Sequence, residues 1–204
     1  MLVDLGLQEI QKLMTKDCKL TMIDVGTGSG CIPISIMKHR INNELQIISY
    51  ASDISFGALK IAKKNANLNH VNIIFKHGNL LIPFQSLISN IKSPLLITAN
   101  LPYLTEEQYH TSPTPEIHKE PKSALVSNDN GLSLYEELLK QIKNLATDYK
   151  LHFILLMEID PSQSQLLTKK IKQIFSRVQV KIKKDYMGNE RVIYVHYCHD
   201  TFVC

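Results

Sequence analysis

Three glycines alternate with other residues after a short apolar stretch, in the run Gly26-Thr27-Gly28-Ser29-Gly30. Glycines in a turn let a ligand lie against bare backbone. The dinucleotide-binding pattern G-x-G-x-x-G needs its third glycine at the position of Cys31, so this tighter loop is not the one expected for a pyrophosphate. Asp53 follows the next apolar stretch, where a carboxylate can accept hydrogen bonds from both hydroxyls of a ribose. The alternative is that Asp53 or Ser55 only caps the following helix.

The G-x-G-x-G form of the loop resembles the first motif of class I methyltransferases, in which the loop holds the methionine end of S-adenosylmethionine. Many of these enzymes carry an acid-containing turn beside the adenine, and this chain has Gly78-Asn79-Leu80 in that position. Asn79 can accept a hydrogen bond from the adenine amino group but brings no charge. The resemblance implies S-adenosylmethionine as the cofactor, bound by Gly26, Thr27, Gly28, Ser29, Gly30, Asp53, Asn79, Leu80 and Asn100.

The run Asn100-Leu101-Pro102-Tyr103 follows another predicted buried strand and supplies the candidate catalytic residues. Asn and Pro also favour simple turns. An amide or aromatic amino nitrogen is a poor nucleophile because its lone pair is delocalised. Two acceptors on its N–H groups, the Asn100 side-chain oxygen and the Leu101 carbonyl, can orient that lone pair toward a sulfonium methyl group. Pro102 favours an extended Leu101, Tyr103 offers a flat wall, and the rate is expected to come from positioning.

The elements that must position these residues alternate along the chain. Strands are predicted over residues 20–25, 45–51, 71–76, 95–99 and 151–159, and a closing hairpin over 178–184 and 191–197. Helices are predicted over residues 4–14, 31–40, 55–67, 131–147 and 162–175. Residues 104–130 lack periodicity and are typical of a lid or binding segment. The order predicts a Rossmann-like α/β fold: a mostly parallel seven-stranded sheet with a C-terminal antiparallel hairpin, helices on both faces and ligands beyond the carboxyl ends of the strands.

The full set of motifs resembles the HemK/PrmC family. These motifs are the glycine loop, Asp53, the Asn100–Tyr103 run, Glu120-Pro121-x-x-Ala124-Leu125, Gly131-Leu132 and Asp185-x-x-Gly188-x-x-Arg191. The resemblance implies transfer of a methyl group to the glutamine amide nitrogen in the Gly-Gly-Gln motif of peptide chain release factors. It therefore implies a release factor as partner and the class I methyltransferase form of the fold.

The chain departs from the family pattern in two places. The family usually has proline at the position of Leu101, so the extra N–H group here needs a hydrogen-bond partner. The family also carries a helical N-terminal domain and a P-R-x-x-T-E segment before the glycine loop, and this chain starts at Met1 after that segment. We therefore expect residues 1–204 to form a single methyltransferase catalytic domain without the family's N-terminal domain.

The composition, with 44% hydrophobic and 21% charged residues among 204, is typical of a globular domain. The longest apolar run, residues 151–157, is too short to span a membrane. The first residues have no signal-peptide pattern, and the four cysteines fit a reducing compartment, so the cytoplasm is expected. The tail with His196, Cys198, His199 and Cys204 lacks the tighter spacing of zinc sites, so no metal is expected.

Two other functions fit parts of the pattern. The run N-L-P-Y also resembles rRNA dimethyladenosine transferases, which makes methylation of adenine in RNA or DNA an alternative. Such enzymes need a wide basic surface, and a net charge of +4 without interleaved aromatic residues gives little support for a nucleic-acid partner. A non-catalytic domain that only binds S-adenosylmethionine is the second alternative.

Overall fold

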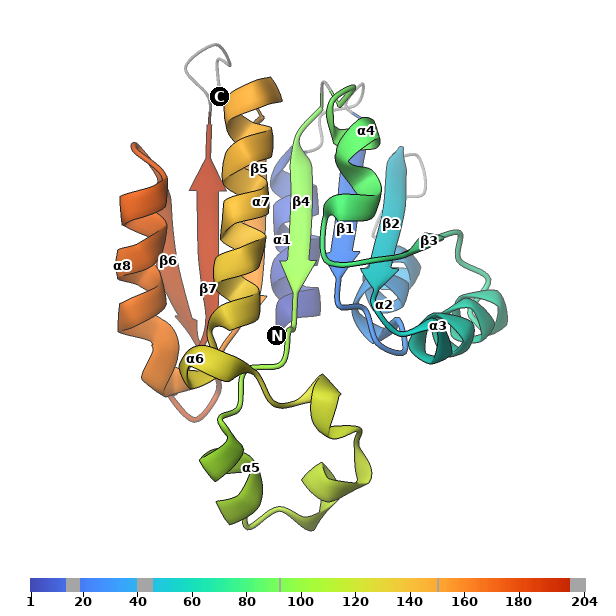
Figure 1. Cartoon of the computed structure of the whole chain (residues 1–204). Helices are drawn as coiled ribbons and strands as arrows, with labels where there is room; N and C mark the ends of the chain where they lie inside the picture. The colour runs from blue at the N-terminus through green and yellow to red at the C-terminus, as the bar shows by residue number, and fades with distance from the viewer. Residues whose placement is uncertain (14–18, 40–45, 92, 150, 199–204) are drawn as a thin grey trace.

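The computed structural model describes residues 1–13, 19–39, 46–91, 93–149 and 151–198. Its centre is a seven-stranded sheet in the order β3-β2-β1-β4-β5-β7-β6 (Figure 1). Only β7 runs against the other strands. The predicted sheet with its C-terminal hairpin is confirmed. The strands are β1 (Leu20–Val25), β2 (Ile47–Asp53), β3 (Ile74–His77), β4 (Leu95–Ala99), β5 (Phe153–Glu158), β6 (Gln179–Lys184) and β7 (Glu190–Tyr197).

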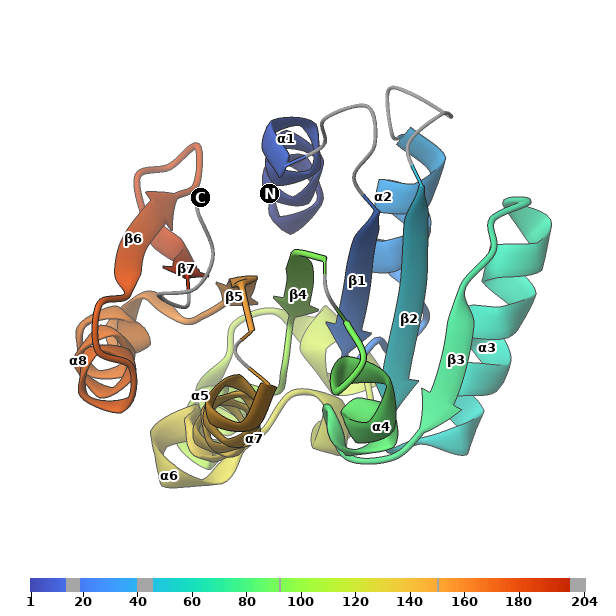
Figure 2. The same ribbon diagram turned by 90° about the horizontal axis from the view of Figure 1, so that it is seen from above.

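Helices cover both faces of the sheet (Figure 2). One face carries α1 (Leu2–Leu13), α2 (Cys31–His39) and α3 (Phe56–Leu68). The other carries α4 (Gln85–Ile88), α7 (Ser133–Tyr149) and α8 (Ser164–Ile174). The predicted helices are present with small shifts at their ends. The predicted helix ends at residues 14 and 40, and the predicted start of the second strand at residue 45, lie outside the described residues.

Two predicted segments differ from the structure. The third strand begins at Ile74 rather than at residue 71, because this edge strand pairs only with the last four residues of β2, Tyr50–Asp53. The segment 104–130 is not wholly irregular, since it contains α5 (Glu106–Thr111) and the start of α6 (Asn128–Gly131). Thr105 and Gln108 form a capping box that starts α5. The segment lies beyond the carboxyl ends of the parallel strands (Figure 1).

Two apolar layers fix the helices on the sheet. On the α7 face, Tyr135, Leu138, Leu139 and Ile142 recur at helical spacing and are fully or almost fully buried against β4 and β5. On the α1 face, the buried carboxylate of Glu9 accepts a hydrogen bond from the Tyr194 hydroxyl at 3.1 Å. Because buried side chains pack the helices against both faces of the sheet, the strand ends that carry the loops are held in place.

The chain passes from β1 outward to β3 and then returns to β4 on the other side of β1. Neighbouring strands whose connections leave in opposite directions leave a crevice at their carboxyl ends, where ligands of α/β proteins bind. The glycine loop follows β1 and the Asn100–Tyr103 run follows β4. The topology therefore brings the two predicted halves of the site together.

Within the described ranges, no helix is long and apolar enough to cross a membrane. No group of His, Cys, Asp or Glu among these residues could hold a metal ion. Cys31 is free and exposed. His199 and Cys204 of the tail lie outside the described residues.

Candidate active site

The glycine loop between β1 and α2 is tied to the end of β2. The Thr27 N–H donates to a β2 carbonyl at 2.9 Å, and the Gly28 N–H donates to Oδ2 of Asp53 at 2.8 Å. A Cβ at Gly26 would lie 2.6 Å from the Leu101 side chain, whereas one at Gly28 would meet nothing within 4 Å. The loop therefore contacts the Asn100–Tyr103 run at Gly26 and leaves open space at Gly28.

Asp53 lies at the centre of this arrangement. Its Oδ1 accepts the Ser55 N–H at 2.8 Å, and Ser55, rather than Asp53, caps α3 by accepting the Ala58 N–H. The Asp53 main-chain oxygen accepts the Gly78 N–H at 3.0 Å, which brings the Asn79 turn alongside. An ionised carboxylate oxygen has more than one acceptor position, so both Asp53 oxygens retain capacity for a ligand.

The Gly78–Leu80 turn has an unusual backbone. Leu80 adopts a left-handed conformation with φ 51°, and its carbonyl accepts the Ser52 hydroxyl at 2.6 Å. The Leu80 side chain packs in the core at 5% exposure, whereas Asn79 is half-buried. Of these two predicted cofactor residues, Asn79 is thus the one whose side chain remains accessible beside Asp53.

Asp24, for which the sequence pattern predicted no role, lies beneath the glycine loop. It is almost fully buried, and its Oδ1 accepts the Thr98 hydroxyl at 2.5 Å. Burial raises the pKa of Asp24 to about 6, which the nearby hydroxyls of Thr27 and Thr98 oppose and the charge of Asp53 reinforces. Its Oδ2 and the Thr27 hydroxyl form no hydrogen bond within the described part of the chain. Its place as the first residue of D-x-G-x-G was the available signal.

The Asn100–Tyr103 run begins directly after β4. Asn100 is exposed, and its side chain forms no hydrogen bond with the described residues. Leu101 is 3% exposed, and its N–H donates to the Tyr135 hydroxyl at 3.3 Å. The N–H group that the family's proline would lack is therefore paired. The same hydroxyl donates to the Glu158 carbonyl at the end of β5.

Three distant segments hold the other end of the run. The Tyr103 carbonyl accepts the Gln163 side-chain amide at 2.9 Å, and a Cβ at Gly131 would lie 1.9 Å from that same oxygen. The Leu104 N–H donates to the Leu125 carbonyl at 2.9 Å. The E-P-x-x-A-L and Gly-Leu elements of the sequence thus pack directly against the Asn100–Tyr103 run.

The turn between β6 and β7 is held together by Asp185. Asp185 accepts the N–H groups of Met187 and Asn189, each at 2.9 Å, and contacts Arg191 Nε at 3.3 Å. These backbone hydrogen bonds lower the pKa of Asp185.

The pKa of Tyr103 is raised, mainly by burial and then by the charge of Glu158, and Arg191 acts in the opposite direction. Tyr103 is therefore a neutral phenol at neutral pH.

Comparison with known proteins agrees with this arrangement. Residues 3–102 match the family model of ribosomal protein L11 methyltransferase (PrmA). The release factor glutamine methyltransferase of Enterococcus faecalis is 36% identical over 177 residues, which cover 86% of this chain and 59% of that protein. This chain is similar in sequence to the release factor glutamine methyltransferases. The predicted resemblance to the HemK/PrmC family is confirmed, and the chain spans about three fifths of the length of the curated relatives it matches.

Solved methyltransferase structures share the fold of this chain. A ribosomal protein L11 methylase from Lactobacillus delbrueckii is 21% identical, with a TM-score of 0.55 over 97% of this chain and 77% of that one. The N-terminal domain of human METTL16, in complex with SAH, is 17% identical, with a TM-score of 0.59 over 97% and 69% of the two chains. The predicted class I methyltransferase fold is confirmed.

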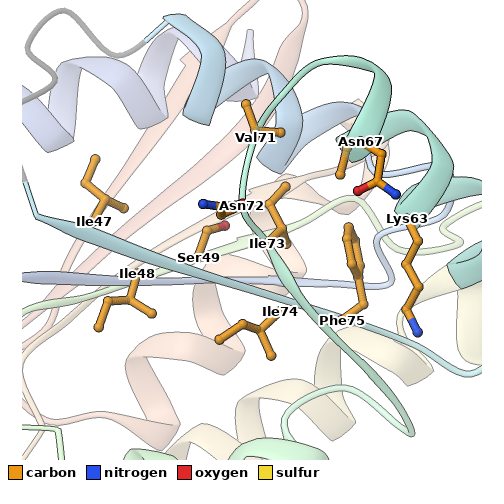
Figure 3. A pocket seen from close by; sticks show the side chains of 11 residues that line it. Ile47, Ile48, Ser49, Lys63, Asn67, Val71, Asn72, Ile73, Ile74 and Phe75 are labelled. Atoms are coloured by element: carbon orange, nitrogen blue, oxygen red, sulfur yellow. The ribbon is translucent and has the colours of Figure 1, made fainter.

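A hollow of about 520 Å³ lies elsewhere, between β2, β3 and α3 (Figure 3). Ile47, Ile48 and Ile74 line it, and the buried Ser49 hydroxyl beside them has no hydrogen-bond partner among the described residues. Ile47 and Ile48 are the first residues of β2, so the hollow lies toward the amino ends of the strands, whereas the glycine loop lies at their carboxyl ends. None of the predicted site residues lines this hollow, so we assign the candidate active site to the carboxyl ends of the strands.

Proposed function

We propose that residues 1–204 form the catalytic domain of an S-adenosylmethionine-dependent protein-glutamine N-methyltransferase. Its substrate is the side-chain amide nitrogen of the glutamine in the Gly-Gly-Gln motif of a peptide chain release factor. One observation carries the proposal: the glycine loop touches the Asn100–Tyr103 run, with a hypothetical Cβ at Gly26 only 2.6 Å from Leu101. A cofactor on the loop would therefore lie directly beside the two acceptors for a planar amide.

The residues around Gly28 fit S-adenosylmethionine. The space at Gly28 is open, and Asp53 next to it retains acceptor capacity for ribose hydroxyls. We assign the half-buried Asn79 as the acceptor for the adenine amino group. The bound cofactor would supply an electrophilic methyl group.

The chain's own part in the reaction is to position the nitrogen. The Asn100 side-chain oxygen and the Leu101 carbonyl accept the two N–H groups of the glutamine amide and turn its lone pair toward the methyl carbon. Bound S-adenosylmethionine would supply the methyl group, and the amide nitrogen that accepts it would release one proton to solvent. No side chain needs to act as a strong base, so orientation supplies the rate.

Pro102 and Tyr103 shape the pocket around that amide. Pro102 restricts the backbone of Leu101 before it, and the half-buried Tyr103 ring offers a flat surface to the planar group. Because burial raises the pKa of Tyr103, its ring carries no charge near the reacting centre. Both residues therefore exclude water and limit rotation of the amide rather than transfer protons.

The partner proposed here is a translation release factor, and its place of action gives the cytoplasm as the location. The test is to incubate the chain with S-adenosylmethionine carrying a labelled methyl group. The acceptors are a release factor, a Gly-Gly-Gln peptide and an adenine-containing RNA, each analysed by mass spectrometry. We expect one added methyl group on the glutamine of the factor and of the peptide. Label on adenine alone would favour the nucleic-acid alternative, and cofactor binding without transfer would favour the non-catalytic one.

A further inference from the structure

The hydroxyl of Tyr135 is the only polar side-chain group that contacts the Leu101 peptide within the described residues. Tyr135 is fully buried on α7 and lies 34 positions from Leu101 in sequence. A buried N–H group without a partner costs free energy, so the Leu101 N–H requires this contact. The contact also joins the end of β4 to the end of β5 through the Glu158 carbonyl.

The direction in which the Tyr135 hydroxyl donates its single proton determines whether the Leu101 carbonyl can accept a hydrogen bond from another group. A tyrosine hydroxyl donates one hydrogen bond and accepts others. Its oxygen lies closest to the Glu158 carbonyl, whereas the Leu101 carbonyl is 3.4 Å away. The proton therefore goes to Glu158, and the oxygen accepts the Leu101 N–H at 3.3 Å. The Leu101 carbonyl, whose only polar side-chain neighbour within the described residues is this hydroxyl at 3.4 Å, keeps at least one lone pair for another donor.

We propose that Tyr135 is a positioning residue that fixes the Leu101 peptide and leaves the Leu101 carbonyl available to the substrate amide. The inference rests on the proposed function, because it assigns an orientation to one of the two acceptors named there. Burial raises the pKa of Tyr135 well above its ordinary value, which keeps the hydroxyl protonated as this role requires. Tyr135 itself touches neither the cofactor nor the reacting atoms.

The test is Tyr135→Phe, which removes the hydroxyl and keeps the ring. The control is Tyr194→Phe, because Tyr194 is also a buried tyrosine whose hydroxyl forms a hydrogen bond, with Glu9, on the opposite face of the sheet. With a Gly-Gly-Gln peptide, Tyr135→Phe should lower kcat about 10-fold or more, with little change in KM or in the Kd for S-adenosylmethionine. Tyr194→Phe should leave kcat within about twofold of the wild-type value. The two variants should lower Tm by similar amounts.

A second variant separates positioning from general loosening. Leu101→Pro removes the N–H group that Tyr135→Phe leaves unpaired and restores rigidity at that residue. We expect the double variant to recover several-fold of the kcat lost by Tyr135→Phe alone. Equal losses of kcat in Tyr135→Phe and Tyr194→Phe, or no recovery in the double variant, would overturn the proposal.

Amide hydrogen exchange gives a readout that does not depend on activity. Tyr135→Phe should raise the exchange rate of the Leu101 amide by about 10-fold or more, whereas Tyr194→Phe should not. If the wild-type chain methylates no glutamine but the Leu101 amide responds as expected, the proposed function fails and the contact stands. If methylation occurs and the amide does not respond, the contact with Tyr135 is wrong.

Discussion

The two halves of the site are built differently. On the cofactor side, the anchoring hydrogen bonds mostly join the main chain of neighbouring strand ends, as in the bonds from the Thr27 N–H to the Ser52 carbonyl and from the Gly78 N–H to the Asp53 carbonyl. On the substrate side, the Asn100–Tyr103 run is held by the side chains of Tyr135 and Gln163, which come from distant elements. The cofactor half is thus a product of sheet geometry, and the substrate half depends on individual side chains.

This difference predicts different responses to substitution. Main-chain hydrogen bonds persist when most side chains change, so cofactor binding should depend mainly on the acid and the glycines. The substrate half should lose orientation, and hence turnover, when any one of its side-chain contacts is removed, because each contact fixes a different peptide of the run. The experiments below test that contrast in order of expected effect.

The largest effect is expected for Asn100→Ala. This change removes the exposed side-chain acceptor and should lower kcat by roughly 10²–10³-fold, by analogy with the loss of one preorganised polar partner. Steady-state kinetics with a Gly-Gly-Gln peptide measures it, and calorimetry with S-adenosylmethionine reports any loss of cofactor affinity. Retention of most of the methyl transfer would show that another group orients the nitrogen.

Gly131→Ala should follow, because its Cβ would lie 1.9 Å from the Tyr103 carbonyl in a backbone with φ 77°. We expect a stability loss of about 3 kcal/mol, measured by urea unfolding. Gly188→Ala is the matched control: Gly188 has φ 86° and nothing within 4 Å of its Cβ. Equal losses in both variants would mean that backbone strain, and not contact with Tyr103, accounts for the effect.

Asp53→Ala probes the cofactor half. It removes the acceptor proposed for both ribose hydroxyls and the partner of the Gly28 N–H. Each charge-assisted hydrogen bond contributes about 1.5–3 kcal/mol, so affinity for S-adenosylmethionine should fall about 30-fold or more. Calorimetry measures the change, and NAD should not bind to either form. Unchanged affinity would remove Asp53 from the site.

Asp24 gives the smallest effect, which appears as a pH dependence. Its folded-state pKa of about 6 exceeds its ordinary value of 3.8, so its contribution to stability is complete below pH 3.8 and is lost as the pH rises through 6. Relative to wild type, Asp24→Asn should therefore gain about 2 kcal/mol of unfolding free energy between pH 4 and pH 7.5. Chemical denaturation at both pH values measures the gain, and a pH-independent difference would contradict the buried, titrating carboxyl.

Much of this architecture was predictable because its signals are local. Apolar periodicity predicted the strands and helices, and the spacing of Gly26, Asp53 and Asn100 predicted a site at the ends of the first, second and fourth strands. The shortening of β3 was not predictable, since an edge strand is limited by how much of its neighbour remains to be paired. Nor was α5, whose six residues are too few to show a helical period.

The order of elements, the glycine loop and the acceptor run can be read from the sequence alone, because each is encoded by residues adjacent in the chain. The hydrogen-bond partner of the extra Leu101 N–H depends on tertiary packing, since Tyr135 lies on α7, 34 positions away in sequence. The raised pKa of Asp24 is likewise a tertiary property, because it arises from the burial that surrounding elements impose. Local propensity selects elements, but the pairing and solvation of a buried polar group depend on which elements pack over it.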